Sequence, residues 1–360
     1  MLLLPLYLGH LGASRAQIGS VMAAASVGGL LGRPLVGWGL DVLGRKPVLV
    51  AGSLVLSLGM ALVALVTSMG PMVYVMRVLV GLGAGTLFAA YFTLASDRIP
   101  ASRRTEGLAL FGISGLLPLL VNPFSDQLGI EPAQLRWFLP AVGALVLTSL
   151  LFLPGVPDPA TSRTPGAVSV RSVGLALTRL SLMPVWLATI VFAGLVAVFM
   201  SFATVAAEAQ GVERPATLWL YYTLGAISVR LLGAKLPDRV GPVKVGAAAL
   251  ASYSFGFWLA SSATTGSDFA AAALFAGLGH GYAYPVLAGQ VITRTPMALR
   301  GMAVAAFTGL WEVARLVLAP GFGALADRTS DGFMLQSASL FGAVGVALWL
   351  GLEALLGRKH

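Results

Sequence analysis

Long apolar runs, separated by short polar turns, follow one another along almost the whole 360-residue chain. Each run approaches the roughly 20 residues that an α-helix needs to cross about 30 Å of hydrocarbon. A shorter apolar stretch, MLLLPLYLGHLGAS, comes first, and we expect it to be the outer half of a first helix whose inner half lies outside this chain. The pattern predicts eleven complete membrane spans, near residues 17–36, 47–67, 72–95, 106–126, 136–154, 185–206, 216–234, 243–261, 269–291, 300–322 and 336–356.

The composition agrees with an all-α polytopic membrane protein. Hydrophobic residues make up 57% of the chain and charged residues only 10%, whereas a soluble domain carries about 25% charged residues. The absence of cysteine excludes disulfides and thiol chemistry, and the three scattered histidines predict no sequence-local metal site. We therefore expect no cofactor.

Basic residues concentrate in alternate turns between the spans. One set of turns, together with the C-terminus, holds seventeen Lys and Arg residues, and the opposite set holds four. The positive-inside rule places the richer set in the cytoplasm. The net charge of +9 is thereby explained by orientation in a bacterial cytoplasmic membrane, with the C-terminus inside, and no nucleic-acid partner is expected.

A tight polar turn, RPLVGWGLDVLGRK at residues 33–46, returns later in the chain as RLLGAKLPDRVGPVK at residues 230–244. Four residues recur 197 positions on and four more recur 196 positions on. Such self-similarity indicates a duplicated half. It predicts six-helix bundles at 1–155 and 183–360, joined by a cytoplasmic loop at 156–182 that is rich in Pro, Ser, Thr and Arg. The recurring pairs are Gly28/Gly225, Arg33/Arg230, Asp41/Asp238 and Gly44/Gly241, and then Gly81/Gly277, Gly83/Gly279, Gly85/Gly281 and Pro100/Pro296.

Two motifs resemble those of a known family. The string Gly37-x-x-x-Asp41-x-x-Gly44-Arg45-Lys46 resembles the signature between helices 2 and 3 of the major facilitator superfamily, and Arg77-x-x-x-Gly81 resembles that family's fourth-helix motif. The resemblance implies twelve helices in two pseudo-symmetric bundles, the first helix being incomplete here. It also implies alternating access around a central cavity, a small-molecule substrate and, usually, a monomer. It is closest in kind to small bacterial efflux members.

The first turn is expected to close the cytoplasmic side. Asp41 can accept hydrogen bonds from amides near a helix end, and Arg45 can hold carbonyls or an acid such as Asp97. The alternative is that Arg45, Lys46 and Asp97 are solvated signals of topology. In the second turn Pro242 and Val243 replace the basic pair, so we expect that turn, with Arg230, Asp238 and Gly241, to be structural.

Polar residues inside the spans are candidates for a substrate or proton-coupling cavity, because a charge in hydrocarbon costs at least ~2.5 kcal/mol. Glu312 and Arg315 are three residues apart on one helix face, either as a constitutive ion pair or as a proton-coupling site. His280 is either a buried neutral histidine or a proton relay and substrate contact. Arg77 either faces the cavity or extends toward the interface. The candidates are Arg77, Tyr91, Asn122, His280, Tyr284, Glu312 and Arg315.

The leading functional hypothesis is proton-coupled export of a small, fairly lipophilic compound. Without a GxxxxGK[ST] phosphate loop, an ion gradient is the expected energy source, and we expect the ion to be the proton. The alternative is proton-coupled transport of a sugar or other polar metabolite, whose cavity would usually hold more polar residues. A remote hypothesis from another class is an intramembrane serine hydrolase. It would use the string Gly112-Ile113-Ser114-Gly115 with His280 as base, although helix packing explains the glycines better.

Overall fold

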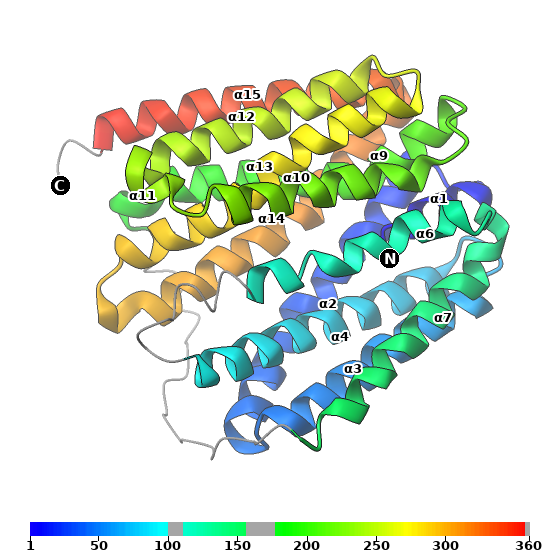
Figure 1. Ribbon diagram of the computed structural model, residues 1–360, viewed down its shortest axis with the longest axis horizontal. Helices are drawn as coiled ribbons and strands as arrows, with labels where there is room; N and C mark the ends of the chain where they lie inside the picture. The colour runs from blue at the N-terminus through cyan, green and yellow to red at the C-terminus, as the bar shows by residue number, and fades with distance from the viewer. Residues whose placement is uncertain (100–110, 156–176, 357–360) are drawn as a thin grey trace.

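The computed structural model describes residues 1–99, 111–155 and 177–356, and within these ranges the chain is helical with no strand (Figure 1). The end of the molecule that the charge pattern predicts to be extracellular is called the outer end here. It lies to the right in Figure 1, where α1 is labelled, and the last described helix, α15, ends at the inner end on the left.

In the N-terminal half, most of the spans predicted for that half lie where the sequence predicts them. The predicted span at 106–126, which would be helix 5 when the incomplete first helix is counted, is described from residue 111. Its helix breaks at Gly115 and continues as two short helices, because Pro118 and Pro123 lack the backbone N–H that a helix interior needs. The elements are α1 (Leu4–His10), α2 (Arg15–Val42), α3 (Arg45–Ala61), η1 (Leu62–Leu65), α4 (Pro71–Arg98), η3 (Leu117–Leu120), α6 (Val121–Gln127), η4 (Pro132–Gln134), α7 (Leu135–Thr148) and η5 (Ser149–Phe152).

The C-terminal half follows the same plan. The predicted loop at 156–182 lies outside the described residues up to position 176, so the domain boundaries stay a prediction. The elements are η6 (Leu180–Leu182), α9 (Met183–Ala209), η7 (Pro215–Thr217), α10 (Leu218–Leu232), α11 (Leu236–Val240), α12 (Pro242–Ser261), α13 (Gly266–Thr293), η8 (Met297–Leu299), α14 (Arg300–Arg328) and α15 (Asp331–Leu356).

Eight helices among the described residues are long and apolar enough to cross a membrane. The segment with α9 is the most enclosed of these, because 89% of its 18-residue apolar stretch is buried. In the corresponding stretches of the α7 and α15 segments only 17% is buried. Since lipid is as apolar as the side chains that face it, the peripheral helices can expose leucines such as Leu151 and Leu355. Helix α9 lies inside the C-terminal half, where it packs against α12, α13, α14 and α15, and it also contacts α1 and α2 of the N-terminal half.

The short helix α1 lies at the outer end, where the sequence placed it. Leu4 and Leu8 are fully buried, and the Tyr7 hydroxyl donates a hydrogen bond to the carbonyl of Val66 just after η1. This apolar contact surface and single polar bond fix α1 against the rest of the outer end.

Reciprocal glycine contacts join α2 to α4. A Cβ added to Gly28 would lie 2.0 Å from the carbonyl oxygen of Val78, and one added to Gly81 would lie 1.9 Å from that of Ala25. Small residues allow two backbones to approach this closely, which is how helices associate without a hydrophobic driving force.

The same contacts recur between α10 and α13. A Cβ on Gly225 would lie 2.5 Å from the Leu274 oxygen, and one on Gly277 would lie 2.1 Å from the Tyr222 oxygen. Both the glycines and the carbonyls they face are separated from their counterparts by 196 or 197 positions. The sequence repeat therefore corresponds to a repeated helix crossing.

Gly81→Ala is expected to destabilise the protein by about 1–3 kcal/mol, because the new methyl group would overlap the backbone of α2. Thermal unfolding of the purified protein in one detergent measures the effect. Gly85→Ala is the matched control one turn away, where the added Cβ would meet its nearest atom at 3.7 Å. Equal melting temperatures for the two variants would contradict the described crossing.

Candidate functional site

The helices α2 and α14 form a long seam between the two halves of the molecule. In its outer part the backbones touch, since a Cβ on Gly19 would lie 2.4 Å from the Ala319 oxygen and one on Gly323 would lie 2.3 Å from the Arg15 oxygen. Further inward, a Cβ on Gly29 would lie 3.6 Å from a carboxylate oxygen of Glu312. This seam carries most of the polar contacts described below.

At the outer end, a carboxylate of α14 caps the N-terminus of α2. The two oxygens of Asp327 accept hydrogen bonds from the backbone N–H groups of Arg15 at 2.7 Å and Ala16 at 2.8 Å. The Arg15 side chain also makes a 2.6 Å ion pair with Asp331 of α15. The positive end of the α2 helix dipole attracts the negative charge of Asp327 and strengthens these hydrogen bonds. This contact therefore holds the two halves together.

A second carboxylate makes the corresponding contact on the other side of the molecule. Asp126 of α6 accepts hydrogen bonds from the backbone N–H of Thr217 at 2.7 Å and from its hydroxyl at 2.9 Å, at the start of the α10 segment. Asp126 and Asp327 are 201 positions apart, as are Ala16 and Thr217. The outer end is thus closed by two crossed carboxylate caps that the duplication relates to each other.

Arginines join the halves again toward the inner end. Arg33 of α2 donates to the hydroxyl and the carbonyl of Thr308 on α14, each at 2.8 Å. Its repeat partner Arg230 donates to the carbonyl of Gly112, in the fifth span, and at 3.1 Å to that of Gly281. Both members of the repeated pair therefore cross between the halves, a role that the turn motif alone did not reveal.

Charges of opposite sign meet midway along the seam. Glu312 and Arg315 lie 3.6 Å apart on α14. Arg77 of α4 is only 5% exposed, and the charges of both Glu312 and Arg315 act on it. Arg33 also interacts with Glu312. The predicted residues Arg77, Glu312 and Arg315 therefore do come together.

Aromatic rings line the C-terminal side of this centre. Trp311, next to Glu312 in sequence, packs edge-on against Phe192 at 5.0 Å and Tyr284 at 5.9 Å between ring centroids. His280 packs against Phe192 and shares a 2.8 Å hydrogen bond through Nδ1 with the Tyr222 hydroxyl. This partner agrees with the hypothesis of a hydrogen-bonded histidine within the bundle.

The space beside Arg315 is small. A void of about 10 Å³ there is lined by Met22, Ala23, Ala197, Met200, Ser201, Arg315 and Ala319. That is room for about one water molecule. An organic ligand can therefore reach Arg315 from this side only if α2, α9 and α14 move apart.

Two predicted cavity residues have their described contacts elsewhere. Tyr91 is half-buried and packs against an apolar cluster of α3 and α4 inside the N-terminal half, which includes Val48 and Leu87. Asn122 is buried near the outer end and donates a 2.7 Å hydrogen bond to the carbonyl of Leu119. Neither contact connects these residues to the Glu312 centre.

The polar turn has the backbone that its glycines predict. Gly44 and Gly241 both adopt positive φ angles, 93° and 104°, which L side chains rarely adopt. Arg45 donates a 3.2 Å hydrogen bond to the carbonyl of Leu40, whereas Gly37, Asp41 and Asp238 are exposed. The Asp97 side chain, the expected partner of Arg45, lies outside the described residues, and the gating role of Arg45, Lys46 and Asp41 stays a prediction.

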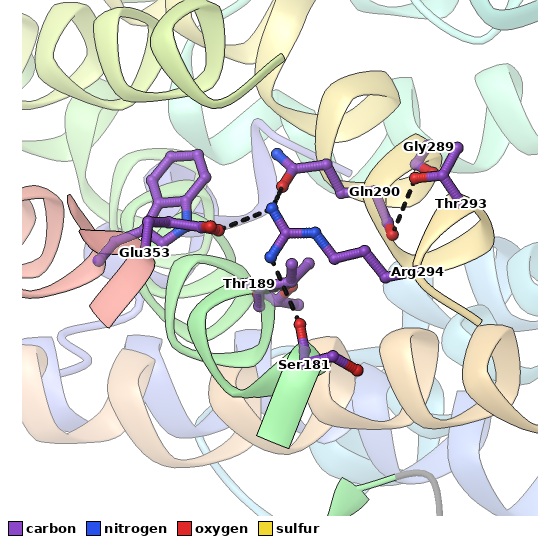
Figure 2. Close-up of polar contacts among 9 residues, drawn as sticks. Ser181, Thr189, Gly289, Gln290, Thr293, Arg294 and Glu353 are labelled. Atoms are coloured by element: carbon purple, nitrogen blue, oxygen red, sulfur yellow. Dashed lines mark hydrogen bonds and ion pairs between the residues drawn. The ribbon is translucent and has the colours of Figure 1, made fainter. Parts of the chain in front are cut away.

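A separate polar cluster braces the inner end of the C-terminal half (Figure 2). Arg294, at the end of α13, makes a 2.8 Å ion pair with Glu353 of α15 and a 2.5 Å hydrogen bond to Gln290. It also donates to the carbonyl of Ser181, just before α9, at 3.4 Å. These contacts stay within one half, so they stabilise the bundle rather than the seam.

Sequence reasoning missed the outer caps by Asp126 and Asp327 and the aromatic residues beside the Glu312 centre. Asp126 and Asp327 lie near helix ends, where acidic residues are common and attract no attention. They are also 201 positions apart, whereas the residues of the repeated turn are 197 positions apart. A search for carboxylates that recur together with helix starts would have found them. Trp311 and Tyr222 gave no signal, because aromatic residues are frequent throughout the spans.

The chain matches the Major Facilitator Superfamily over residues 1–319, and it belongs to this family of membrane transporters. It is 26% identical to an uncharacterized MFS-type transporter of Salmonella typhimurium, covering 100% of this chain and 92% of that protein. It is 24% identical to the gentisate transporter of Corynebacterium glutamicum, covering 96% and 82%.

Solved structures share the fold at low sequence identity. A mutant of the nucleoside transporter NupG superposes with a TM-score of 0.80 at 13% identity, covering 98% of this chain and 94% of that chain. A POT family transporter in complex with a thioalcohol-conjugated peptide also superposes with a TM-score of 0.80, at 10% identity, covering 96% and 89%. The two-bundle fold expected from the motifs is thereby confirmed.

The serine-hydrolase hypothesis does not fit this family of transporters. The Ser114 hydroxyl donates a 2.7 Å hydrogen bond to the Phe111 carbonyl of its own turn, while His280 is engaged by Tyr222. The GISG string instead supplies the carbonyl of Gly112 that Arg230 holds. Gly112 of this string therefore takes part in a contact between the two halves.

Asp327→Asn is expected to loosen the outer end, because removing the charge weakens two hydrogen bonds to the start of α2 by about 1 kcal/mol or more. The chain has no cysteine, so Ser201→Cys, which lines the void beside Arg315, introduces a single thiol. Labelling of this thiol by a membrane-impermeant maleimide should become about fivefold faster in the double variant.

Asp268→Asn is the matched control for this experiment. Asp268 is also at the outer end but hydrogen-bonds Thr264 and Thr265 of its own loop, so its loss leaves the seam intact. Equal acceleration by both substitutions would show that Asp327 has no special part in closing the outer end.

Proposed function

We propose that the protein is a proton-coupled secondary transporter that works by alternating access, with Glu312 as the proton-coupling group. The observation that carries this proposal is the position of Glu312 at the centre of the seam. It lies 3.6 Å from Arg315, and it interacts electrostatically with Arg33 and Arg77. A carboxylate that exchanges a proton for an arginine partner changes the attraction between α14 and the N-terminal helices. Protonation would thereby be coupled to the movement of one half against the other.

The outer contacts suit one of the two alternating conformations. The caps by Asp126 and Asp327 close the outer end, and we expect them to break when the cavity opens outward. The turn at residues 33–46 is proposed to close the cytoplasmic end in that second conformation. Orientation in a bacterial cytoplasmic membrane, with the C-terminus inside, follows from the distribution of basic residues and belongs to this proposal.

For the substrate, the geometry favours the polar alternative over lipophilic export. Export of a lipophilic compound was inferred from apolar cavity helices, but the centre of the seam holds Arg77, Arg315 and Glu312, with Arg33 about one helical turn further inward. A polar metabolite gains charge-assisted hydrogen bonds there, whereas a lipophilic compound leaves these charges uncompensated. The Corynebacterium relative is named a gentisate transporter, so an organic acid belongs in any panel of test compounds.

Glu312→Gln is expected to abolish proton-driven accumulation by at least about tenfold, since a glutamine cannot exchange a proton. The measurement is uptake by proteoliposomes under an imposed pH gradient, with a panel of gentisate, benzoate, a sugar and a lipophilic cation. Counterflow exchange without a gradient should survive in the same variant. Glu213→Gln, in an exposed outer loop, is the matched control.

Two results would contradict the proposal. Proton-driven uptake that persists in Glu312→Gln would leave Glu312 as a constitutive ion pair with Arg315. Accumulation of the lipophilic cation alone would return the substrate to the lipophilic class.

A further inference from the structure

The centre of the seam carries a surplus of positive charge. Glu312 is the one acid that the described part of the chain places midway across the membrane-spanning region, and it faces Arg77 and Arg315, with Arg33 further inward. A single carboxylate cannot neutralise three guanidinium groups. Because uncompensated charge is costly in hydrocarbon, a bound anion would stabilise this centre.

Two buried donors at the centre also lack partners. The Nε of Arg77 and the hydroxyl of Ser26 have no hydrogen-bond partner among the residues that the structure describes, and their residues are 5% and 1% exposed. Ser26 lies on α2 between Ala23, which clusters with Ala319, and Gly29, which faces Glu312. Arg77 directly precedes Val78 on α4, whose carbonyl faces Gly28 next to Gly29. Both donors therefore lie near the level of Glu312 and Arg315, where an anion can accept their hydrogen bonds.

An apolar surface adjoins these donors. The rings of Trp311 and Tyr284 lie edge-on to each other at 5.9 Å, and both side chains are only half-buried. Trp311 directly precedes Glu312 on α14. A flat ring can pack on these aromatic side chains while a charged group attached to it reaches Arg315.

We propose that this cluster binds a small aromatic carboxylate, with the carboxylate held between Arg77 and Arg315 and the ring against Trp311 and Tyr284. The inference rests on the proposed transport function and adds the substrate class and its site. Two arginine forks suit a carboxylate better than a neutral amide, because each guanidinium can donate two parallel hydrogen bonds to it.

The same geometry explains how anion and proton become coupled. The substrate carboxylate competes with Glu312 for Arg315, so a bound substrate leaves Glu312 with a weaker partner and favours its protonation. The other charged or titratable groups facing Glu312 are Arg33 from α2, Arg77 from α4 and, through Arg33, Tyr284 from α13. The anion and the proton would therefore bind together, and affinity for the anion would rise as the pH falls.

Equilibrium binding of radiolabelled benzoate to the full chain in nanodiscs tests the site, with unlabelled benzamide as the neutral competitor of the same shape. Benzoate is expected to bind at least about tenfold more tightly than benzamide. Arg77→Gln and Arg315→Gln should each weaken benzoate binding by about tenfold or more, and Arg77→Lys should weaken it less. Arg239→Gln, exposed in α11 at the inner end, should bind as the unsubstituted protein does.

Glu312→Gln provides a test that misfolding cannot imitate. Removing the competing carboxylate should strengthen benzoate binding at pH 7.5 and abolish the rise in affinity between about pH 7.5 and 5.5. Weaker binding in this variant, or an unchanged pH dependence, would overturn the competition between the two carboxylates.

The outcomes separate the site from the transport function. Equal affinity for benzoate and benzamide, or equal losses in Arg239→Gln and Arg77→Gln, would overturn the anion site. If benzoate binds as expected but no pH gradient drives its uptake, the site stands and the proposed function fails. If another compound is accumulated in a Glu312-dependent manner while benzoate does not bind, the site alone fails.

Discussion

The structure depends on polar contacts that cross between its two halves. Inside a bilayer the hydrophobic effect does not press helices together, so backbone approach and hydrogen bonds must hold the seam. Asp327 and Asp126 each cap the start of a helix in the opposite half, and Arg33 and Arg230 each reach a carbonyl of the opposite half. Because all four contacts join the halves rather than stabilise either one, they can break without unfolding a bundle. Such contacts suit the proposed movement of the two halves as rigid bodies.

The centre of the seam combines this arrangement with an unusual charge balance. Most intramembrane arginines in a transporter need a partner, and Arg33 finds one in Thr308. Arg77 instead shares Glu312 with Arg315. In the proposed mechanism, this imbalance favours the binding of an anion and leaves Glu312 either paired with an arginine or protonated. Substrate binding and proton binding are then coupled through the same charges.

Much of the fold could be predicted from the sequence, because apolar runs and repeated glycines depend on local pattern alone. Ten predicted spans coincide with helices, and the span at 106–126, which is described from residue 111, is broken at Gly115, Pro118 and Pro123. Arg77, Glu312 and Arg315 were found because a charge inside a span is conspicuous. Asp327 was not, since its role comes from the N-terminus of a helix 311 positions earlier. The described contacts of Tyr91 and Asn122 lie within their own half, because a polar residue inside a span can satisfy itself there, so their place in a cavity stays a prediction.

The position of Glu312 along α14 has a mechanical consequence. Thr308 and Asp327 lie four and fifteen residues from it, or about 6 Å and 22 Å along the helix axis. A rigid rotation about the level of Glu312 therefore displaces the outer cap almost four times as far as the contact between Arg33 and Thr308. In the proposed mechanism, the contact between Arg33 and Thr308 would persist during such a rotation because it lies close to the axis. A small rearrangement around Glu312 would then produce a wide opening at the outer surface.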